Sequence, residues 1–204
     1  VALLTYPPMI EKFVVNQCRL NLKSVPRSGE GKIRMALIGA GEFARSAHLP
    51  NMQALSRQYH LRAVVNRTGP SAKSVGQQFG ADYVCTDPAE VLADPEVDAV
   101  LIATRHHLHG SLALAALKAG KHVLVEKPLT LSRHELAELD AFYGNKAPDS
   151  DIENKPILLT GYNRRFSPHV IRMQQLLAQR TAPFIVSYRM NVGYVPLDHW
   201  VHGP

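Results

Sequence analysis

The sequence predicts an α/β fold built on a doubly wound parallel sheet, followed by the start of a second α/β domain. From residue 33 onward, short apolar runs alternate with helical patterns, as strand–helix–strand units do. The run 97–103 (VDAVLIA) is apolar almost throughout, which is typical of a parallel strand covered on both faces. Right-handed crossovers between such strands place helices on both faces of one sheet.

The first half of the chain should hold three strands. The lead-in over 1–32 is expected to be poor in strands, because prolines and the Gly29–Gly31 turn interrupt it. Residues 33–38 (IRMALI) suit a buried strand, and 43–55 can form a helix that Pro50 should kink or end. Further strands are expected at 61–67 and around 83–84, with helices at 71–79, closed by Gly80, and just after Pro88.

The second half continues the alternation. The strand at 97–103 precedes a helix at 111–119, which Gly120 ends. After a strand at 122–128, Ser132 and Glu135 form a capping-box pattern for a helix that reaches about Tyr143. A polar linker at 144–155 is followed by a strand at 157–160, a helix at 168–179 and a strand at 184–191.

Composition excludes several classes of protein. The 204 residues are 46% hydrophobic and 20% charged, so the chain is neither disordered nor rich enough in apolar runs to cross a membrane. Cys18 and Cys85 lie far apart, which argues against a disulfide framework or a thiolate zinc site. Val1 starts the chain without a secretion-signal pattern, so we expect a cytoplasmic protein. The net charge of +6 is spread along the chain, so no nucleic-acid partner is expected.

A glycine-rich turn follows the first predicted strand. Gly39 would allow the sharp turn, Gly41 would let the backbone approach a pyrophosphate, and Ala44 would let helix and strand pack closely. Ala40, Glu42 and Phe43 complete this candidate loop, and the Glu42 carboxylate would have to point away from the phosphates. A tight bend that binds nothing is the alternative, because the motif alone is weak.

Three further motifs resemble one family. EKP at 126–128, ATRHHLHG at 103–110 and GYNRRFSP at 161–168 are similar to the glucose-fructose oxidoreductase and inositol dehydrogenase (Gfo/Idh/MocA) family, over roughly residues 33–200. LTYP at 4–7 and VPLDHW at 195–200 resemble a branch in which a zinc-dependent alcohol dehydrogenase-like half precedes this domain. We therefore expect a junction over 1–32, a dinucleotide-binding Rossmann domain over 33–166 and an incomplete C-terminal domain over 167–204.

The resemblance implies a role for each motif. Lys127 would be the catalytic acid or base, and a cis peptide bond with Pro128 would aim it inward. Glu126 would contact the nicotinamide ribose or make a structural contact. Thr104 and the residues after it would lie beside the cofactor, with His109 near the nicotinamide; Arg105 and His106 depart from the family's usual Thr-Pro-Asn pattern. Asn163 and Arg164 would reach toward nicotinamide and substrate, although a structural ion pair is an equal alternative for one arginine.

The cofactor is expected to be NADP or NAD. The second strand ends in Asn66-Arg67-Thr68, without the acidic residue that usually accepts the adenosine ribose hydroxyls. Arg67 could pair with a 2′-phosphate or stack on adenine, which mildly favours NADP, and a surface arginine is the alternative. No metal is expected at His106, His107 and His109, because no supporting carboxylate or cysteine has a suitable spacing.

These observations support an oxidoreductase that moves a hydride between NAD(P) and a secondary alcohol or ketone of a sugar, inositol or nucleotide-sugar substrate. The alternative is a non-catalytic dinucleotide-binding sensor or scaffold. The sequence ends at Gly203-Pro204, where the family's Gly-rich segment should begin, so we expect a truncated chain, and the missing part of the C-terminal sheet would supply a homo-oligomer contact.

Overall fold

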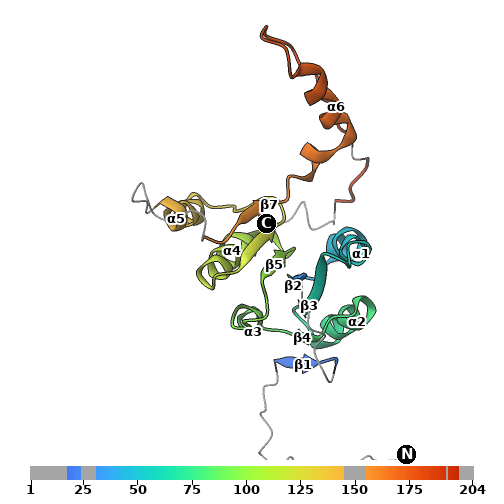
Figure 1. Cartoon of the computed structure of the whole chain (residues 1–204), viewed down its shortest axis with the longest axis vertical. Coiled ribbons are helices and arrows are strands. Elements are labelled where there is room, and N and C mark those ends of the chain that lie inside the picture. The colour runs from blue at the N-terminus through green and yellow to red at the C-terminus, as the bar shows by residue number, and fades with distance from the viewer. Residues whose placement is uncertain (1–17, 24–30, 145–154, 192, 198–204) are drawn as a thin grey trace, which may run out of the picture. The chain divides into compact units, whose positions relative to one another are not determined.

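In the computed structural model, residues 18–23, 31–144, 155–191 and 193–197 are described. They fall into two units, Val1–Tyr162 and Asn163–Pro204, and this division lies a few residues before the boundary expected from the sequence. The first unit holds the whole sheet, and Figure 1 shows its strands and helices along the chain. The predicted linker at 144–155 lies largely outside the described residues. In the lead-in, Pro7, Pro8, Pro26 and Gly29 also lie outside them.

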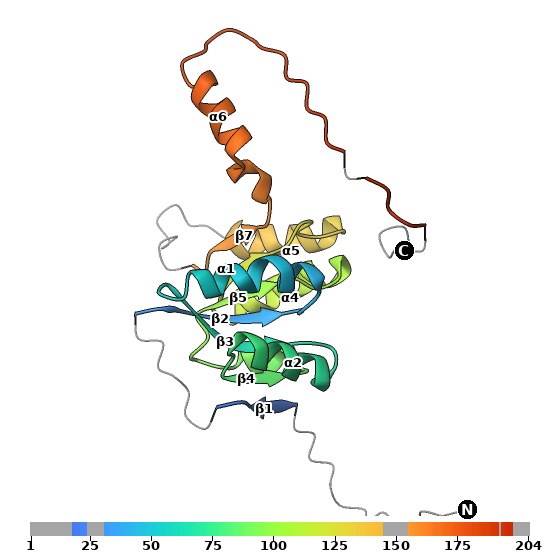
Figure 2. The same ribbon diagram turned by 90° about the vertical axis from the view of Figure 1, so that its right-hand side faces the viewer.

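The described strands of the first unit form one seven-stranded sheet in the order β1-β4-β3-β2-β5-β6-β7. All neighbouring strands are parallel except β1 and β4, so the doubly wound fold class is confirmed. Figure 2 shows β1 at one edge and β7 at the other. The strands are β1 (Arg19–Asn21), β2 (Ile33–Ile38), β3 (Tyr59–Val65), β4 (Tyr83–Cys85), β5 (Ala99–Ile102), β6 (His122–Val125) and β7 (Leu158–Thr160).

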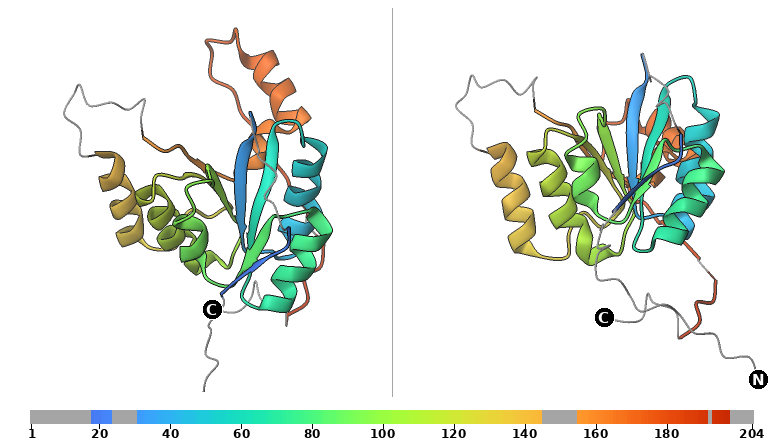
Figure 3. Two further views of the ribbon diagram at one scale, coloured as in Figure 1. Left: turned by 60° about the horizontal axis from the view of Figure 1, so that its bottom comes forward. Right: turned by 90° about the horizontal axis from the view of Figure 1, so that it is seen from below.

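Helices cover both faces of this sheet (Figure 3). One face carries α1 (Leu49–Ala54) and α2 (Gly69–Phe79). The other carries α3 (Pro88–Leu92), α4 (His109–Lys118) and α5 (Arg133–Gly144). No helix within the described ranges has the length and apolar character needed to cross a membrane.

The core consists of two layers, because successive strand residues point to opposite faces. Leu37 and Val64 pack with Val75 of α2 on one side of the sheet. Ile38 and Ile102 pack with Leu117 of α4 on the other. The short apolar runs therefore form strands that are buried on both faces, as their lack of alternation predicts.

The lead-in differs from the sequence prediction. Arg19–Asn21 forms β1, which pairs with β4 in antiparallel register, so the sheet begins earlier than residue 33. Three residues on an edge carry too little periodicity to be recognised. The Arg19 guanidinium lies 3.7 Å from the centre of the Tyr83 ring, a contact that the sequence pattern does not reveal.

Pro50 does not end the first helix. Residues Ala44–His48 adopt a π-helical segment, and α1 continues through Pro50 to Ala54. The Leu49 N–H donates to the Ala44 carbonyl, a wider turn than the α-helical one. Proline occupies an early position of α1, where its missing N–H costs little.

The second unit lacks the strand expected at 184–191. Its described residues hold a 3₁₀ turn at Asn163–Phe166 and α6 (Pro168–Leu177), and residues 184–191 have no regular structure. The Ser167 hydroxyl accepts from the Val170 N–H and so begins α6. A strand requires a hydrogen-bonded neighbour, and the described part of this unit offers none. The β-favouring composition of 184–191 is therefore not sufficient to form a strand.

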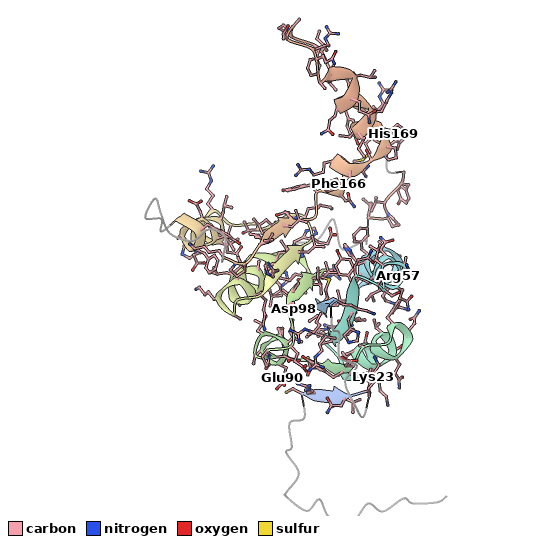
Figure 4. All side chains as sticks on the ribbon, viewed as in Figure 1. Lys23, Arg57, Glu90, Asp98, Phe166 and His169 are labelled. Atoms are coloured by element: carbon pink, nitrogen blue, oxygen red, sulfur yellow. The ribbon has the colours of Figure 1, made fainter. Side chains whose placement is uncertain are left out.

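Charged side chains gather at the amino ends of the parallel strands. We call Lys23, His60, Arg62, Asp82 and Asp94 the amino-edge cluster. Asp82 accepts from Lys23 Nζ at 2.8 Å and lies 2.7 Å from His60 Nε2. Asp94 accepts from Arg62 Nε at 3.1 Å and from the Tyr83 hydroxyl at 2.9 Å. Lys23 and the nearby Asp98, which binds Arg34, are labelled in Figure 4.

This cluster predicts a loss of stability in acid. Burial opposes ionisation of Asp82, but hydrogen bonds from His60 and Lys23 outweigh it and hold the Asp82 pKa below its ordinary value of 3.8. The folded state thus binds fewer protons than the unfolded state, so this contribution is complete above about pH 5 and is lost as pH falls below about 4. In urea unfolding between pH 3 and 7, Asp82→Asn should flatten the decline, whereas exposed Asp140→Asn should follow the wild type. Equal pH slopes for the wild type and Asp82→Asn would contradict this assignment.

Candidate active site

The glycine turn packs tightly against the end of β5. Gly39 has φ +94°, and its N–H donates to the Val65 carbonyl at 2.9 Å. A Cβ at Gly39 would lie 2.7 Å from the Ala103 carbonyl oxygen and 2.8 Å from Thr104 Cγ2. Both the backbone conformation and the close approach therefore require glycine here.

Gly41 has a different environment. A Cβ built there meets no atom within 4 Å, so this position faces open space beside the turn. Ala40 and Ala44 are buried. A small residue at Ala44 lets the helix approach the sheet, as the third position of the motif requires.

The helix after the turn presents free amides. Its first α-type hydrogen bond runs from Arg45 N to the Gly41 carbonyl at 3.1 Å. The N–H groups of Glu42, Phe43 and Ala44 precede that bond and have no acceptor within the helix. Backbone amides at a helix start, beside a position without a side chain, bind phosphate oxygens, so this cradle fits a pyrophosphate. Glu42 and Phe43 are exposed.

The EKP motif follows β6, two strands from the glycine turn. Its Lys127–Pro128 peptide bond is cis, as expected. The Lys127 side chain is exposed, and its backbone N–H lies 3.3 Å from Glu126 Oε2. The segments after β2, β5 and β6 lie at the carboxyl edge of adjacent parallel strands, next to the point where the strand order reverses. Open α/β sheets bind their ligands at such a point.

The strand order and the glycine turn are those of a dinucleotide-binding fold. Residues 33–146 match the Gfo/Idh/MocA family, described as an oxidoreductase family with an NAD-binding Rossmann fold. The chain belongs to this family. The predictions of an oxidoreductase family and of an NAD-binding Rossmann fold are thereby confirmed.

Relatives of the Gfo/Idh/MocA chain include inositol dehydrogenases and a 3-ketoreductase. Myo-inositol 2-dehydrogenase of Thermotoga maritima is 29% identical over 187 residues, covering 83% of this chain and 52% of that protein. The scyllo-inositol 2-dehydrogenase (NAD(+)) of Bacillus subtilis is 32% identical over 140 residues, covering 68% and 38%. A 3-ketoreductase of Actinomadura kijaniata, solved with NADP, has a TM-score of 0.62 at 30% identity, covering 72% and 44%. The chain thus spans about half the length of these proteins or less.

His109 of this Gfo/Idh/MocA chain is fully buried. Its Nδ1 donates to the Pro128 carbonyl at 2.7 Å, and its Nε2 lies 3.2 Å from the Thr104 carbonyl. The ring thus ties the EKP turn to the segment after β5. Direct contact between His109 and a nicotinamide stays a prediction.

His106 lies beside the same turn. Burial, followed by the neighbouring His109, Lys127 and Arg105, holds the His106 pKa below its ordinary value of 6.5. Its ring packs edge-on against His109, with 5.6 Å between ring centroids. His106 is therefore neutral at pH 7 and can serve there as a hydrogen-bonding group near Lys127. Arg105 is exposed and Thr104 partly buried, and the Thr104 hydroxyl donates to the Arg105 carbonyl.

The loop after β3 carries no carboxylate at its tip. The Asn66 amide donates to the Ser71 hydroxyl at 2.7 Å, and its carbonyl oxygen accepts from the Arg67 N–H at 3.0 Å. Asn66 thus holds the start of α2, while the Arg67 side chain is exposed. The tip of this loop therefore presents an arginine and no carboxylate.

The remaining predicted site residues belong to the second unit. Asn163 and Arg164 are exposed residues of the second unit, which is described by itself, so their predicted contact with cofactor and substrate is not tested. Among the described residues, no three His, Cys, Asp or Glu side chains come together as a metal site.

Sequence reasoning missed one residue. His48, at the end of the π-helical segment, lies with its Nε2 2.7 Å from Glu126 Oε1. A carboxylate only accepts, so Nε2–H donates. The two residues are separated by 78 positions in the chain, and only the packing of the first helix against the sheet edge brings them together.

Proposed function

We propose that the chain is the cofactor-binding part of an NAD(P)-dependent oxidoreductase acting on a secondary alcohol or ketone of a sugar, inositol or nucleotide-sugar substrate. One observation carries the proposal: the glycine cradle after β2 and the EKP turn after β6 lie at the same edge of the sheet. The substrate class rests on the relatives, which include inositol dehydrogenases and a 3-ketoreductase.

Each group at the edge has a defined task. The amides of residues 42–44 would hold the pyrophosphate, and Gly41 would leave room for it. The bound nicotinamide would supply hydride chemistry. The Lys127 amine would accept the hydroxyl proton when an alcohol is oxidised, or donate a proton to the carbonyl oxygen when a ketone is reduced. His106, held neutral beside Lys127, would offer a hydrogen bond to the substrate.

Calorimetric titration of the full chain with NADPH and NADH tests the cofactor step. We expect binding of at least one, and binding of neither contradicts the proposal. Oxidation of inositols and nucleotide sugars, followed by NADPH or NADH absorbance, then tests the substrate class.

Arg67 is proposed to pair with the 2′-phosphate of NADP. Arg67→Ala should weaken NADPH binding about 10-fold, because one charge-assisted hydrogen bond is lost, and leave NADH binding nearly unchanged. The matched control is Arg57→Ala, which removes an exposed arginine before β3, at the opposite edge (labelled in Figure 4), and should change neither affinity. An equal loss of affinity for both cofactors would assign Arg67 to adenine stacking instead.

Three further expectations remain proposals. A preceding zinc-dependent alcohol dehydrogenase-like half rests on LTYP at 4–7, outside the described residues, and on VPLDHW at 195–200, of which 195–197 are described. A homo-oligomer contact through a C-terminal sheet and a cytoplasmic location rest on family resemblance and on the sequence alone.

A further inference from the structure

The Glu126 carboxylate is held from three directions. Oε1 accepts from His48 Nε2 at 2.7 Å, and Oε2 lies 3.3 Å from the Lys127 backbone N–H. A Cβ at Gly161 would lie 3.0 Å from Oε1 and 3.1 Å from Oε2. The carboxylate therefore packs directly against the backbone that follows β7.

These contacts join segments that are distant in the chain. His48 belongs to the helix after the glycine turn, Glu126 follows β6, and Gly161 follows β7. The Gly161 N–H also donates to the Val125 carbonyl at 2.8 Å, so the backbone just before Glu126 is held by the same residue. The side chains of His48 and Glu126 are only 20% and 13% exposed, which shields their interaction from solvent.

The π-helical segment Ala44–His48 carries His48. His48 is the last residue of the π-helical segment, and the Phe43 ring packs edge-on against it with 5.1 Å between ring centroids. The segment that presents the phosphate cradle at its start thus presents His48 at its end. One element contacts both the candidate cofactor site and the EKP turn.

We propose that His48 and Glu126 form a positioning pair that fixes the EKP turn and with it the Lys127 amine, and that Glu126 is not a ribose contact. The proposal rests on the proposed function for the task of Lys127. Both residues act through Lys127, because the Glu126 carboxylate is already occupied by His48, the Lys127 amide and the Gly161 backbone.

Three measurements on the full chain test the pair with His48→Ala. Hydrogen exchange of the peptide covering 122–130 should speed up about 10-fold, because the carboxylate loses its strongest partner. The dissociation constant for NADPH should stay within about twofold, because no cofactor contact is removed. With a substrate identified as above, kcat should fall about 10-fold while KM changes little, because the amine is displaced from its productive position.

Rescue separates positioning from simple packing. His48→Gln keeps an N–H donor near the Nε2 position and should restore exchange and kcat to near wild-type values. Gly161→Ala forces the carboxylate to move and should act like a milder His48→Ala. The matched control is His60→Ala, which breaks another 2.7 Å histidine–carboxylate contact at the opposite edge and should leave exchange at 122–130 unchanged.

The outcomes are distinct. Unchanged exchange in His48→Ala overturns the proposal, as does His48→Gln behaving like His48→Ala. A weakened NADPH affinity in Glu126→Gln with His48→Ala unaffected also overturns it and makes Glu126 a ribose contact. Failure of the wild type to bind either cofactor contradicts the proposed function instead, and the exchange measurement still decides whether the pair fixes the turn.

Discussion

Replacement of Gly39 by alanine should weaken NADPH binding about 10²-fold or more and lower the stability of the fold. The added Cβ would meet the Ala103 carbonyl oxygen at 2.7 Å, and φ +94° is unfavourable for alanine. The strain alone costs about 1–2 kcal/mol. A turn that moves away from Ala103 to relieve the contact also moves the amides of residues 42–44, and each lost charge-assisted hydrogen bond costs about 1.5–3 kcal/mol.

Two other glycines separate these effects. Gly41→Ala adds a Cβ to open space without a positive φ, so it should leave the unfolding midpoint unchanged while weakening NADPH binding about 10-fold. Gly144→Ala, at the end of α5, also adds a Cβ to open space and should change neither quantity. Thermal unfolding and NADPH titration of the three variants provide the comparison. Wild-type affinity in Gly41→Ala would show that no pyrophosphate approaches this turn.

The parallel core was predictable because burial on both faces leaves a local signature. Apolar runs such as 33–38 and 99–102 need no knowledge of their neighbours to be recognised as strands. The glycine turn was equally local, since its three positions lie within six residues. The right-handed crossovers restrict the possible strand orders, and the coordinates give the one observed.

Features that depend on a partner were not predictable in the same way. The strand at 19–21 exists because β4 offers it an edge, and the segment at 184–191 lacks a strand because the described part of its unit offers none. Pro50 was expected to kink or end the helix, but the wider turn over 44–48 accommodates it. In the first two cases the presence or absence of a long-range hydrogen-bonded neighbour decided the outcome, and at Pro50 a local change in the helical hydrogen-bond pattern did.

In the candidate site too, local motifs were predictable and long-range contacts were not. EKP and the glycine turn were found as motifs, whereas the contact between His48 and Glu126 required coordinates because no sequence spacing relates residues 78 positions apart. His109 was expected beside the nicotinamide, which stays a prediction, and the coordinates add that its two ring nitrogens face the carbonyls of Pro128 and Thr104. A motif therefore identifies a residue as important without giving its task.

Lys127→Ala tests that task for the residue on which the chemistry depends. Under the proposed function the rate with substrate should fall by about 10²-fold or more, because a positioned acid or base contributes about 10²–10⁴-fold to proton transfer. NADPH affinity should change little, because the cradle at residues 39–44 is untouched. Lys118→Ala, which removes an exposed lysine from the end of α4, is the matched control and should alter neither value.

The pH dependence of His106 adds a second readout to the same variant. The positive charge of Lys127 is one cause of the low His106 pKa, after burial and the contribution of His109. Its removal should raise the His106 pKa toward 6.5, which NMR titration of the imidazole can follow. If the His106 pKa rises in Lys127→Ala and the rate is unchanged, Lys127 lies near His106 but has no catalytic role, as in a dinucleotide-binding sensor or scaffold. If the His106 pKa rises and the rate falls, the result favours the enzyme.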